Sequence, residues 1–273
     1  MPVISTNNAA NAALNYLNNN TTTENQQMAS LASGSRITQA SDDAAGLAIG
    51  TQLKASVTVY QQDQVNVQQG NSILQTADGA LAQISNILQR MMALATQAAS
   101  GQVTDAQRSQ DINTEYSQLS SEVSTIVSST RYAGQTVLSG SFLQGVKFLV
   151  GTTSANTISV TVSSVSGSAL GINGSVTTAS SALAAIATLT SAINTITQDR
   201  AKLGAYESRF NFSLQDISTN IQNVSAAASV INDADVASVK SSLSASDVKT
   251  QASVAALTQA AQLPQELLRL IQS

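Results

Sequence analysis

Three residue types that carry much of enzyme chemistry are missing: the 273-residue chain has no histidine, cysteine or tryptophan. Without histidine and cysteine it lacks the commonest general base and the commonest soft-metal ligands. Ser-His and Cys-His nucleophile pairs and an HExxH zinc protease are therefore excluded. A disulfide framework is excluded too, although such a chain can still work outside the cell. We expect no catalytic residue, no metal site and no cofactor.

Charged side chains are also scarce, at 10% of residues, with 12 Lys and Arg against 16 Asp and Glu. No basic stripe exists, so nucleic acid is not expected as a partner. A weakly charged surface gives little protection against self-association. Composition by itself favours an ordinary Ala/Ser-rich helical protein.

The N-terminus lacks the basic start and apolar core of a signal peptide. Secretion would therefore need a route without a cleaved signal. No run of 18 apolar residues is present, so we expect no membrane insertion. The first 40 residues are polar and Asn-rich, and residues 18–27 contain no aliphatic side chain. A helix there has little face to bury and should form only when it packs against neighbours.

Two segments carry the alternating 3-and-4 spacing of helices that pack side by side at a shallow angle. Residues 43–99 predict one long helix, with Ser41 or Asp42 as its N-cap. Residues 182–235 predict a second. Two such helices from opposite halves of the chain indicate antiparallel pairing, although an unrelated bundle would show the same spacing. The apolar stripe of the first helix is Leu74, Ala77, Leu81, Ile84, Leu88, Met91, Ala95 and Ala98.

The middle of the chain has a different character. Residues 105–130 predict one shorter helix. Residues 146–150 and 157–162 have strand composition, and the second run alternates apolar and polar residues, so together they predict a β-hairpin. Residues 163–181 are rich in Ser, Gly and Thr and predict an exposed loop.

Six short motifs, in order along the chain, resemble those of bacterial flagellin. They begin near residue 33 and end at residue 270, so the resemblance spans most of the chain. The motifs are SGSRI followed by DDAAG (33–46), LQR with Leu94 and Gln97 (88–97), TRYAGQTVLSG (130–140), AKLGAYESRF (201–210), INDADVA (231–237) and QLPQELLRL (262–270).

The resemblance implies a mainly α fold: a long antiparallel helical hairpin or coiled-coil rod with a small β-hairpin region in the middle of the chain. It implies an inner terminal helical domain, residues 1–40 plus 240–273, that is disordered in the monomer. Residues 41–239 would form a helical rod domain with the hairpin and loop at about 141–181. Many flagellins carry large variable domains in this middle region. The short segment here suggests little or no outer domain.

The function implied by the resemblance is that of a structural subunit that polymerises into the bacterial flagellar filament and gives motility. Contacts that repeat without closing on themselves build an open helix. The subunit would be exported unfolded and would reside outside the cell, in the flagellum. Implied partners are copies of itself, an export chaperone and the secretion apparatus, and the cap and junction proteins. A hook-filament junction protein of the same family is the alternative. Proteases carried by some flagellins are disfavoured by the lack of histidine.

Two sets of candidate site residues follow. Apolar residues of the terminal helices are expected to make the inner subunit contacts: Leu14, Leu17, Leu257, Leu263, Leu267, Leu268 and Ile271. In this family the long helix also carries a surface read by the flagellin-sensing Toll-like receptor. The residues that match this candidate receptor motif are Arg90, Leu94 and Glu115, and the alternative is that they make subunit contacts.

Overall fold

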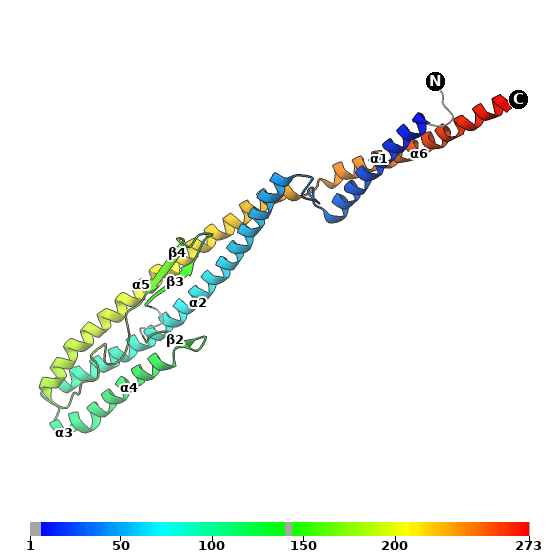
Figure 1. Cartoon of the computed structure of the whole chain (residues 1–273). Helices are drawn as coiled ribbons and strands as arrows, with labels where there is room; N and C mark the ends of the chain where they lie inside the picture. Colours follow the sequence, from blue (N-terminus) through cyan, green and yellow to red (C-terminus); the bar gives the residue numbers. More distant parts are fainter. Residues whose placement is uncertain (1–6, 140–143, 273) are drawn as a thin grey trace. The chain divides into compact units, whose positions relative to one another are not determined.

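The computed structural model describes residues 7–139 and 144–272, and the side chains of all of these except Gln144 and residues 263–272. Over this part the fold is mainly α, as predicted, with two small antiparallel strand pairs, of which the sequence predicted one (Figure 1). The elements are α1 (Asn8–Ser33), α2 (Ala44–Ala99), α3 (Asp105–Gln107), the π-helix η1 (Arg108–Ile112), α4 (Asn113–Ser129), β1 (Arg131–Tyr132), β2 (Gln135–Thr136), β3 (Gln144–Leu149), β4 (Thr157–Thr161), α5 (Ala179–Asn232) and α6 (Val236–Gln272).

The chain divides into two compact units. Unit 1 comprises residues 1–56 and 223–273, and unit 2 comprises residues 57–222. Unit 1 contains α1, α6 and the loops that precede α2 and follow α5. Unit 2 contains α4, the β-hairpin and most of α2 and α5. The two units divide within α2 and α5, whereas the sequence-based boundaries are at residues 40 and 240.

Unit 2 is built on the predicted stripe of α2. All eight stripe residues, from Leu74 to Ala98, have no exposed surface. On α5, alternate positions of the predicted 3-and-4 seam are buried from Leu189 to Ile217. Between them Ile193, Glu207 and Leu214 are partly buried and Arg200 is exposed. The buried set is Leu189, Ile196, Leu203, Phe210 and Ile217. The 3-and-4 spacing thus identified the core faces of both long helices.

Within unit 2, α2 and α5 run antiparallel, which confirms the pairing expected from their spacing. The guanidinium of Arg200 donates to both carboxylate oxygens of Asp78, from Nε to Oδ1 at 2.7 Å and from Nη2 to Oδ2 at 3.1 Å. Earlier in α2, Gly70 lies against Phe210, later in α5. A lower number on one helix therefore meets a higher number on the other. The two-pronged geometry of the Arg200–Asp78 pair also favours one register over its neighbours.

The β-hairpin packs on the same helices. β3 pairs antiparallel with β4, with Phe148 opposite Ile158. The rings of Phe148 and Phe210 meet edge to face, with centroids 5.3 Å apart. A Cβ on Gly70 would lie 3.1 Å from both rings, so glycine permits this close approach. The hairpin was predicted within two residues at each end.

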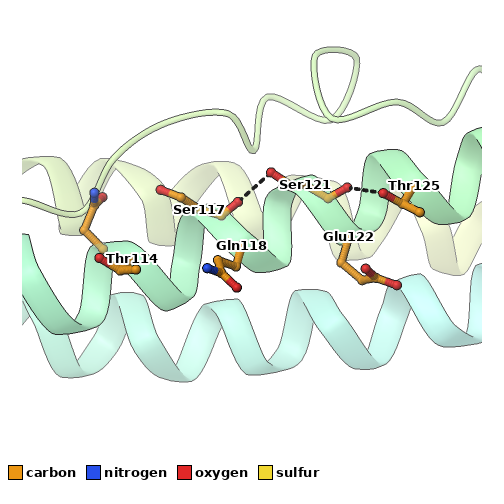
Figure 2. A pocket seen from close by; sticks show the side chains of 7 residues that line it. Thr114, Ser117, Gln118, Ser121, Glu122 and Thr125 are labelled. Carbon is orange, nitrogen blue, oxygen red and sulfur yellow. Dashed lines mark hydrogen bonds between the residues drawn. The ribbon is translucent and has the colours of Figure 1, made fainter.

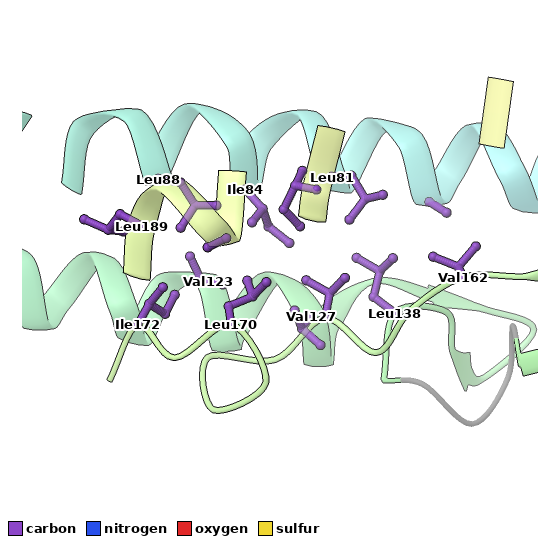
Figure 3. Close-up of a cluster of buried hydrophobic side chains, with 14 of the residues drawn as sticks. Leu81, Ile84, Leu88, Val123, Val127, Leu138, Val162, Leu170, Ile172 and Leu189 are labelled. Atoms are coloured by element: carbon purple, nitrogen blue, oxygen red, sulfur yellow. The ribbon is translucent and has the colours of Figure 1, made fainter. Parts of the chain in front are cut away.

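The segment after the hairpin contradicts the prediction of an exposed loop. Four of its aliphatic side chains are buried in the core of unit 2, among residues of α2, α4 and α5 (Figure 3). They are Val165, Leu170, Ile172 and Val176. The prediction was wrong because the aliphatic residues are few and separated by Ser and Gly. A loop packed on a core needs only an occasional anchor, without regular spacing.

The predicted helix over residues 105–130 is interrupted by the π-helix η1, which a spacing argument does not detect. The buried side chain of Arg108, the first residue of η1, connects this region to the end of α2. Its Nε donates to Ala98 O at 2.6 Å and its Nη2 to Ser100 O at 2.7 Å, while Nη1 pairs with Asp105. One buried arginine thus satisfies carbonyls at the C-terminal end of α2, which a helix end otherwise leaves without partners.

Among the described residues one helix, α5, contains an 18-residue window whose mean hydropathy of 1.3 would suffice, by length and composition, to cross a membrane. The core helices of many soluble proteins pass the same test, so one such helix is weak support for a membrane span. In this helix 28% of the window is buried inside the protein, and the seam residues Leu189 and Ile196 belong to the core of unit 2.

Replacing Asp63 with asparagine is expected to stabilise unit 2. Asp63 is 1% exposed, its Oδ2 has no hydrogen-bond partner among the residues that the structure describes, and burial raises its pKa above the ordinary value. The pKa of Asp63 is higher in the folded state than in the unfolded state, so binding of a proton to Asp63 stabilises the fold. This contribution is full below about pH 3.8 and is lost as the pH rises through the folded pKa. Asp63→Asn should add about 1 kcal/mol, or about 2–4 °C in Tm, at pH 7. Thermal unfolding at pH 7 and pH 3.5 tests this: the gain should shrink at the lower pH, and a lower Tm at pH 7 would contradict it.

Candidate functional site

The terminal helices α1 and α6 pack against each other in unit 1. Among the described residues of α1, none is fully buried by this packing. Three hydrogen bonds show that they run antiparallel. Asn7 Nδ2 donates to Ala260 O at 2.6 Å, Asn20 Nδ2 to Ser253 Oγ at 2.9 Å, and Thr250 Oγ1 to Glu24 Oε2 at 3.0 Å. The polar run at residues 18–27 is therefore helical, and it packs through polar contacts.

The predicted contact residues of this pair fall into three groups. Leu14 is 45% exposed and thus available to another molecule. Leu17 and Leu257 are partly buried, at positions in phase with the residues that join α1 to α6. They therefore contribute to pairing within the chain. The side chains of Leu263, Leu267, Leu268 and Ile271 lie outside the described residues.

The outer surface of the α1–α6 pair carries large apolar side chains that the described part of the chain leaves uncovered. Tyr16 is 68% exposed and Val248 is 65% exposed, and Met28 and Val254 are about half exposed. A groove of 440 Å³ runs between the two helices beside Tyr16. Its lining consists of Ala13, Tyr16, Asn20, Lys249, Ala252, Ser253 and Ala256. This surface can bury apolar area only against another molecule.

Two of the motifs from opposite ends of the chain interlock in unit 1. Ser35, in SGSRI, forms an antiparallel bridge with Asp233, in INDADVA. The amide of Arg36 donates to Asn232 O at 2.6 Å, and the amide of Ala234 donates to Gly34 O at 2.9 Å. These bonds tie the loop before α2 to the loop after α5. Their resemblance to flagellin motifs identified both strings of residues, but the sequence did not indicate that they contact each other.

The side chain of Arg36 strengthens this junction. Its Nε and Nη2 donate to Ile231 O, near the C-terminus of α5, at 3.1 and 2.9 Å. Nη2 also pairs with Asp43 Oδ2 at 3.4 Å. A cation at a helix C-terminus also interacts favourably with the helix dipole. A Cβ on Gly50 of α2 would collide with the side chain of Asn232, the last residue of α5. Glycine at this position therefore lets α2 approach the end of α5 closely.

Neither predicted N-cap of α2 acts as one. Asp43 fills that role, because its Oδ1 accepts from the amide of Gly46 at 2.8 Å. Asp42 instead holds the preceding loop, since its Oδ2 accepts from the amide of Gln39 and from the amide and hydroxyl of Thr38. These bonds, with that from Gln39 the largest cause, lower the pKa of Asp42. The loop should therefore loosen as the pH falls below the ordinary value of 3.8.

Arg36→Ala is expected to loosen the junction without unfolding unit 2. A hydrogen bond to a charged group contributes about 1.5–3 kcal/mol when buried, and less here because the side chain is 52% exposed. We expect hydrogen exchange at the Ala234 amide to rise about tenfold, which corresponds to about 1.4 kcal/mol. Arg131→Ala is the matched control, because Arg131 also donates to two carbonyls, Ser128 O and Gly134 O, but in unit 2. Unchanged exchange at Ala234 in the Arg36 variant would contradict the assigned role.

The three residues of the candidate receptor motif are only partly at the surface. Arg90 and Glu115 form an ion pair between α2 and α4 with an Nη2–Oε1 distance of 2.7 Å, and their side chains are 57% and 44% exposed. Leu94 is 3% exposed and belongs to the core of unit 2. The exposed part of the motif thus consists of the ion pair.

The exposed side of α4 carries an open polar hollow of 590 Å³ (Figure 2). All its lining residues come from this one helix: Asn113, Thr114, Ser117, Gln118, Ser121, Glu122 and Thr125. The hydroxyls of Ser121 and Thr125 donate to carbonyls four residues earlier in the same helix. These two hydroxyls are therefore engaged within α4.

Comparisons with known proteins cover both halves of the chain. Models of the bacterial flagellin N-terminal and C-terminal helical regions match residues 4–142 and 186–271. The flagellar filament 30.7 kDa core protein of Treponema maltophilum is 35% identical over 256 residues, covering 88% of this chain and 90% of that protein. Flagellin of Bacillus subtilis (strain 168) is 33% identical over 301 aligned residues, covering 98% and 99%. A crystal structure of Bacillus cereus flagellin matches with a TM-score of 0.50 and 30% identity, covering 60% of this chain and 94% of that one.

Proposed function

The chain belongs to the bacterial flagellin family, and from that premise we infer that it is a structural subunit of the extracellular flagellar filament. The single observation that carries this function onto the structure is the uncovered apolar surface of the α1–α6 pair. Burial of that surface against copies of the same chain would drive polymerisation at about 25 cal/mol per Å². Contacts between unlike faces then build an open helix.

The direct test is growth on seeds. Purified chain added to short fragments of its own filaments should elongate them, as followed by light scattering and electron microscopy. Failure to elongate, with only a single layer added at the seed ends, would instead favour the hook-filament junction role. No observation on this chain favours that alternative.

The inner contacts are proposed to come from Leu14 on α1 and from the apolar residues near the C-terminus, Leu263, Leu267, Leu268 and Ile271. Leu17 and Leu257 are proposed to act indirectly, by holding α1 and α6 together. A structural role is the function of this family, and we propose that the chain has no enzymatic activity.

We also propose that the ends, residues 1–40 and 240–273, are disordered in the free monomer. The α1–α6 pair has little core, because α1 has no buried residue and the described part of α6 buries only Leu243, Ser246 and Ala260. So little burial does not offset the entropy of ordering two long helices. Limited proteolysis of the monomer should remove about 40 residues from each end and leave unit 2 intact. Ends as resistant as unit 2 would contradict this proposal.

Further partners are proposed from the family alone. They are an export chaperone, the secretion apparatus, and the cap and junction proteins of the flagellum. For the flagellin-sensing Toll-like receptor, the exposed ion pair Arg90–Glu115 is the proposed contact, while the buried Leu94 would support α2 from inside.

A further inference from the structure

The seam between α1 and α6 has a polar centre. In α1 the least exposed positions follow the 3-and-4 spacing, as do those in α6. Such positions are usually apolar. Here the middle three of each helix are polar, and we call these six residues the polar block: Asn20, Glu24 and Gln27 on α1, and Ser246, Thr250 and Ser253 on α6. Leu17 and Leu31 flank the block on α1, and Leu243 and Leu257 flank it on α6.

The hydrogen bonds of the polar block join the two different helices. Glu24 accepts from the hydroxyl of Thr250, and Asn20 donates to Ser253. Two α1 helices paired antiparallel with each other would bring two Glu24 carboxylates, which only accept, to the same level and without the Thr250 hydroxyl. Gln27 Oε1 is buried without a partner among the described residues, so the block costs stability that a leucine would not.

The block also opposes a slip along the seam. With Glu24 level with Thr250, a shift of seven residues in either direction would bring Glu24 level with Leu257 or Leu243. The Thr250 hydroxyl would then lie about 10 Å away along the axis, and the nearest hydroxyl of the block about one helical turn away, given a rise of 1.5 Å per residue. An all-leucine seam would tolerate the same shift with little change in packing.

We propose that the polar block is the specificity determinant of the terminal helices: it admits α1 only against α6 and only in one register. This inference deepens the proposed function, because a growing polymer concentrates the ends of many identical chains. Apolar seams would pair there with any copy in several registers. A single polar position in a helical seam has the same effect on register, at a cost in stability.

The test uses the lack of cysteine in the full chain. Asn20 meets Ser253, so residue 13, two turns earlier in α1, is level with residue 260, two turns later in α6, and Ala13→Cys with Ala260→Cys reports the native register. Ala13→Cys with Ser253→Cys, in which a thiol replaces the hydroxyl, reports a shift of seven residues. Each pair is oxidised in the soluble fraction and in the fraction sedimented with seeds, and intrachain cross-links are measured by gel mobility. In the otherwise unchanged chain we expect the native pair to form at least about tenfold faster than the shifted pair.

The decisive variant is Asn20→Leu with Glu24→Leu and Gln27→Leu, which should bring the two rates within about threefold. Ser253 already donates to Lys249 O, so this change leaves its hydroxyl proton bonded. The matched control, Asn18→Leu with Thr22→Leu and Asn25→Leu, adds the same side chains at exposed positions and should keep the native preference. Glu24→Gln keeps an acceptor and should keep it as well.

A leucine variant that retains the native preference overturns the proposal, and so does an otherwise unchanged chain with no preference in either fraction. Equal loss of preference in the exposed-face control would show that added hydrophobicity, and not the polar block, sets the register. If the chain fails to sediment with seeds, the proposed function is contradicted. Because the ends are proposed to be disordered in the free chain, cross-linking in the soluble fraction captures only transient α1–α6 pairs. The native pair must still form faster there than the shifted pair.

Discussion

Replacing residues 164–178 with a short Gly/Ser linker is expected to destabilise unit 2 severely. The segment places four buried aliphatic side chains on the core: Val165, Leu170, Ile172 and Val176. Loss of a buried Leu or Ile side chain costs about 2–5 kcal/mol, so losing all four approaches the whole stability of a domain, about 5–15 kcal/mol. Loop shortening changes the closure entropy too little to compensate. We expect the cooperative thermal transition of unit 2, measured by circular dichroism, to be lost.

Point variants separate this effect from gross damage to the chain. Leu170→Ala and Ile172→Ala should each lower the free energy of unfolding by about 2–4 kcal/mol in urea titrations. Leu183→Ala is the matched control, because Leu183 is 62% exposed and should change it by less than about 0.5 kcal/mol. If the linker variant unfolds like the parent chain, the segment does not belong to the core.

Leu14→Asp is expected to prevent polymerisation while leaving the monomer folded. Leu14 is 45% exposed on α1, beside the uncovered apolar surface of the α1–α6 pair. Burying one leucine contributes about 1.5–3 kcal/mol per subunit contact, and a buried unpaired carboxylate costs still more. The monomer concentration needed for seeded growth should therefore rise by about 100-fold or more, since each 1.4 kcal/mol is tenfold.

The control for this experiment is Asn15→Asp, which adds the same charge at the next, exposed position without removing an apolar side chain. It should polymerise near the normal concentration. Circular dichroism of both monomers should be unchanged, because neither residue is buried in unit 1. Normal seeded growth of the Leu14→Asp chain would place the subunit contact elsewhere. The equivalent Asp substitutions at Leu267 and Leu268 remain predictions of the same kind.

The sequence by itself determined the fold class, the long helices and the family. The regular 3-and-4 spacing located the buried stripe of α2 and the seam of α5 because every residue in such a stripe reports the same helix period. The β-hairpin followed from alternation for the same reason. Ordered motifs at both ends identified the family because each is a local string of residues that needs no knowledge of contacts.

Only the tertiary structure decided what meets what. The burial of Ile172 and its neighbours, the bonds of Arg36 to the end of α5, and the π-helix at Arg108 have no local period. The polar run at residues 18–27 predicted a weak helix, but not that Asn20 and Glu24 find matching hydroxyls on α6. Such contacts join residues some 200 positions apart, and their energy depends on a partner that local sequence does not specify.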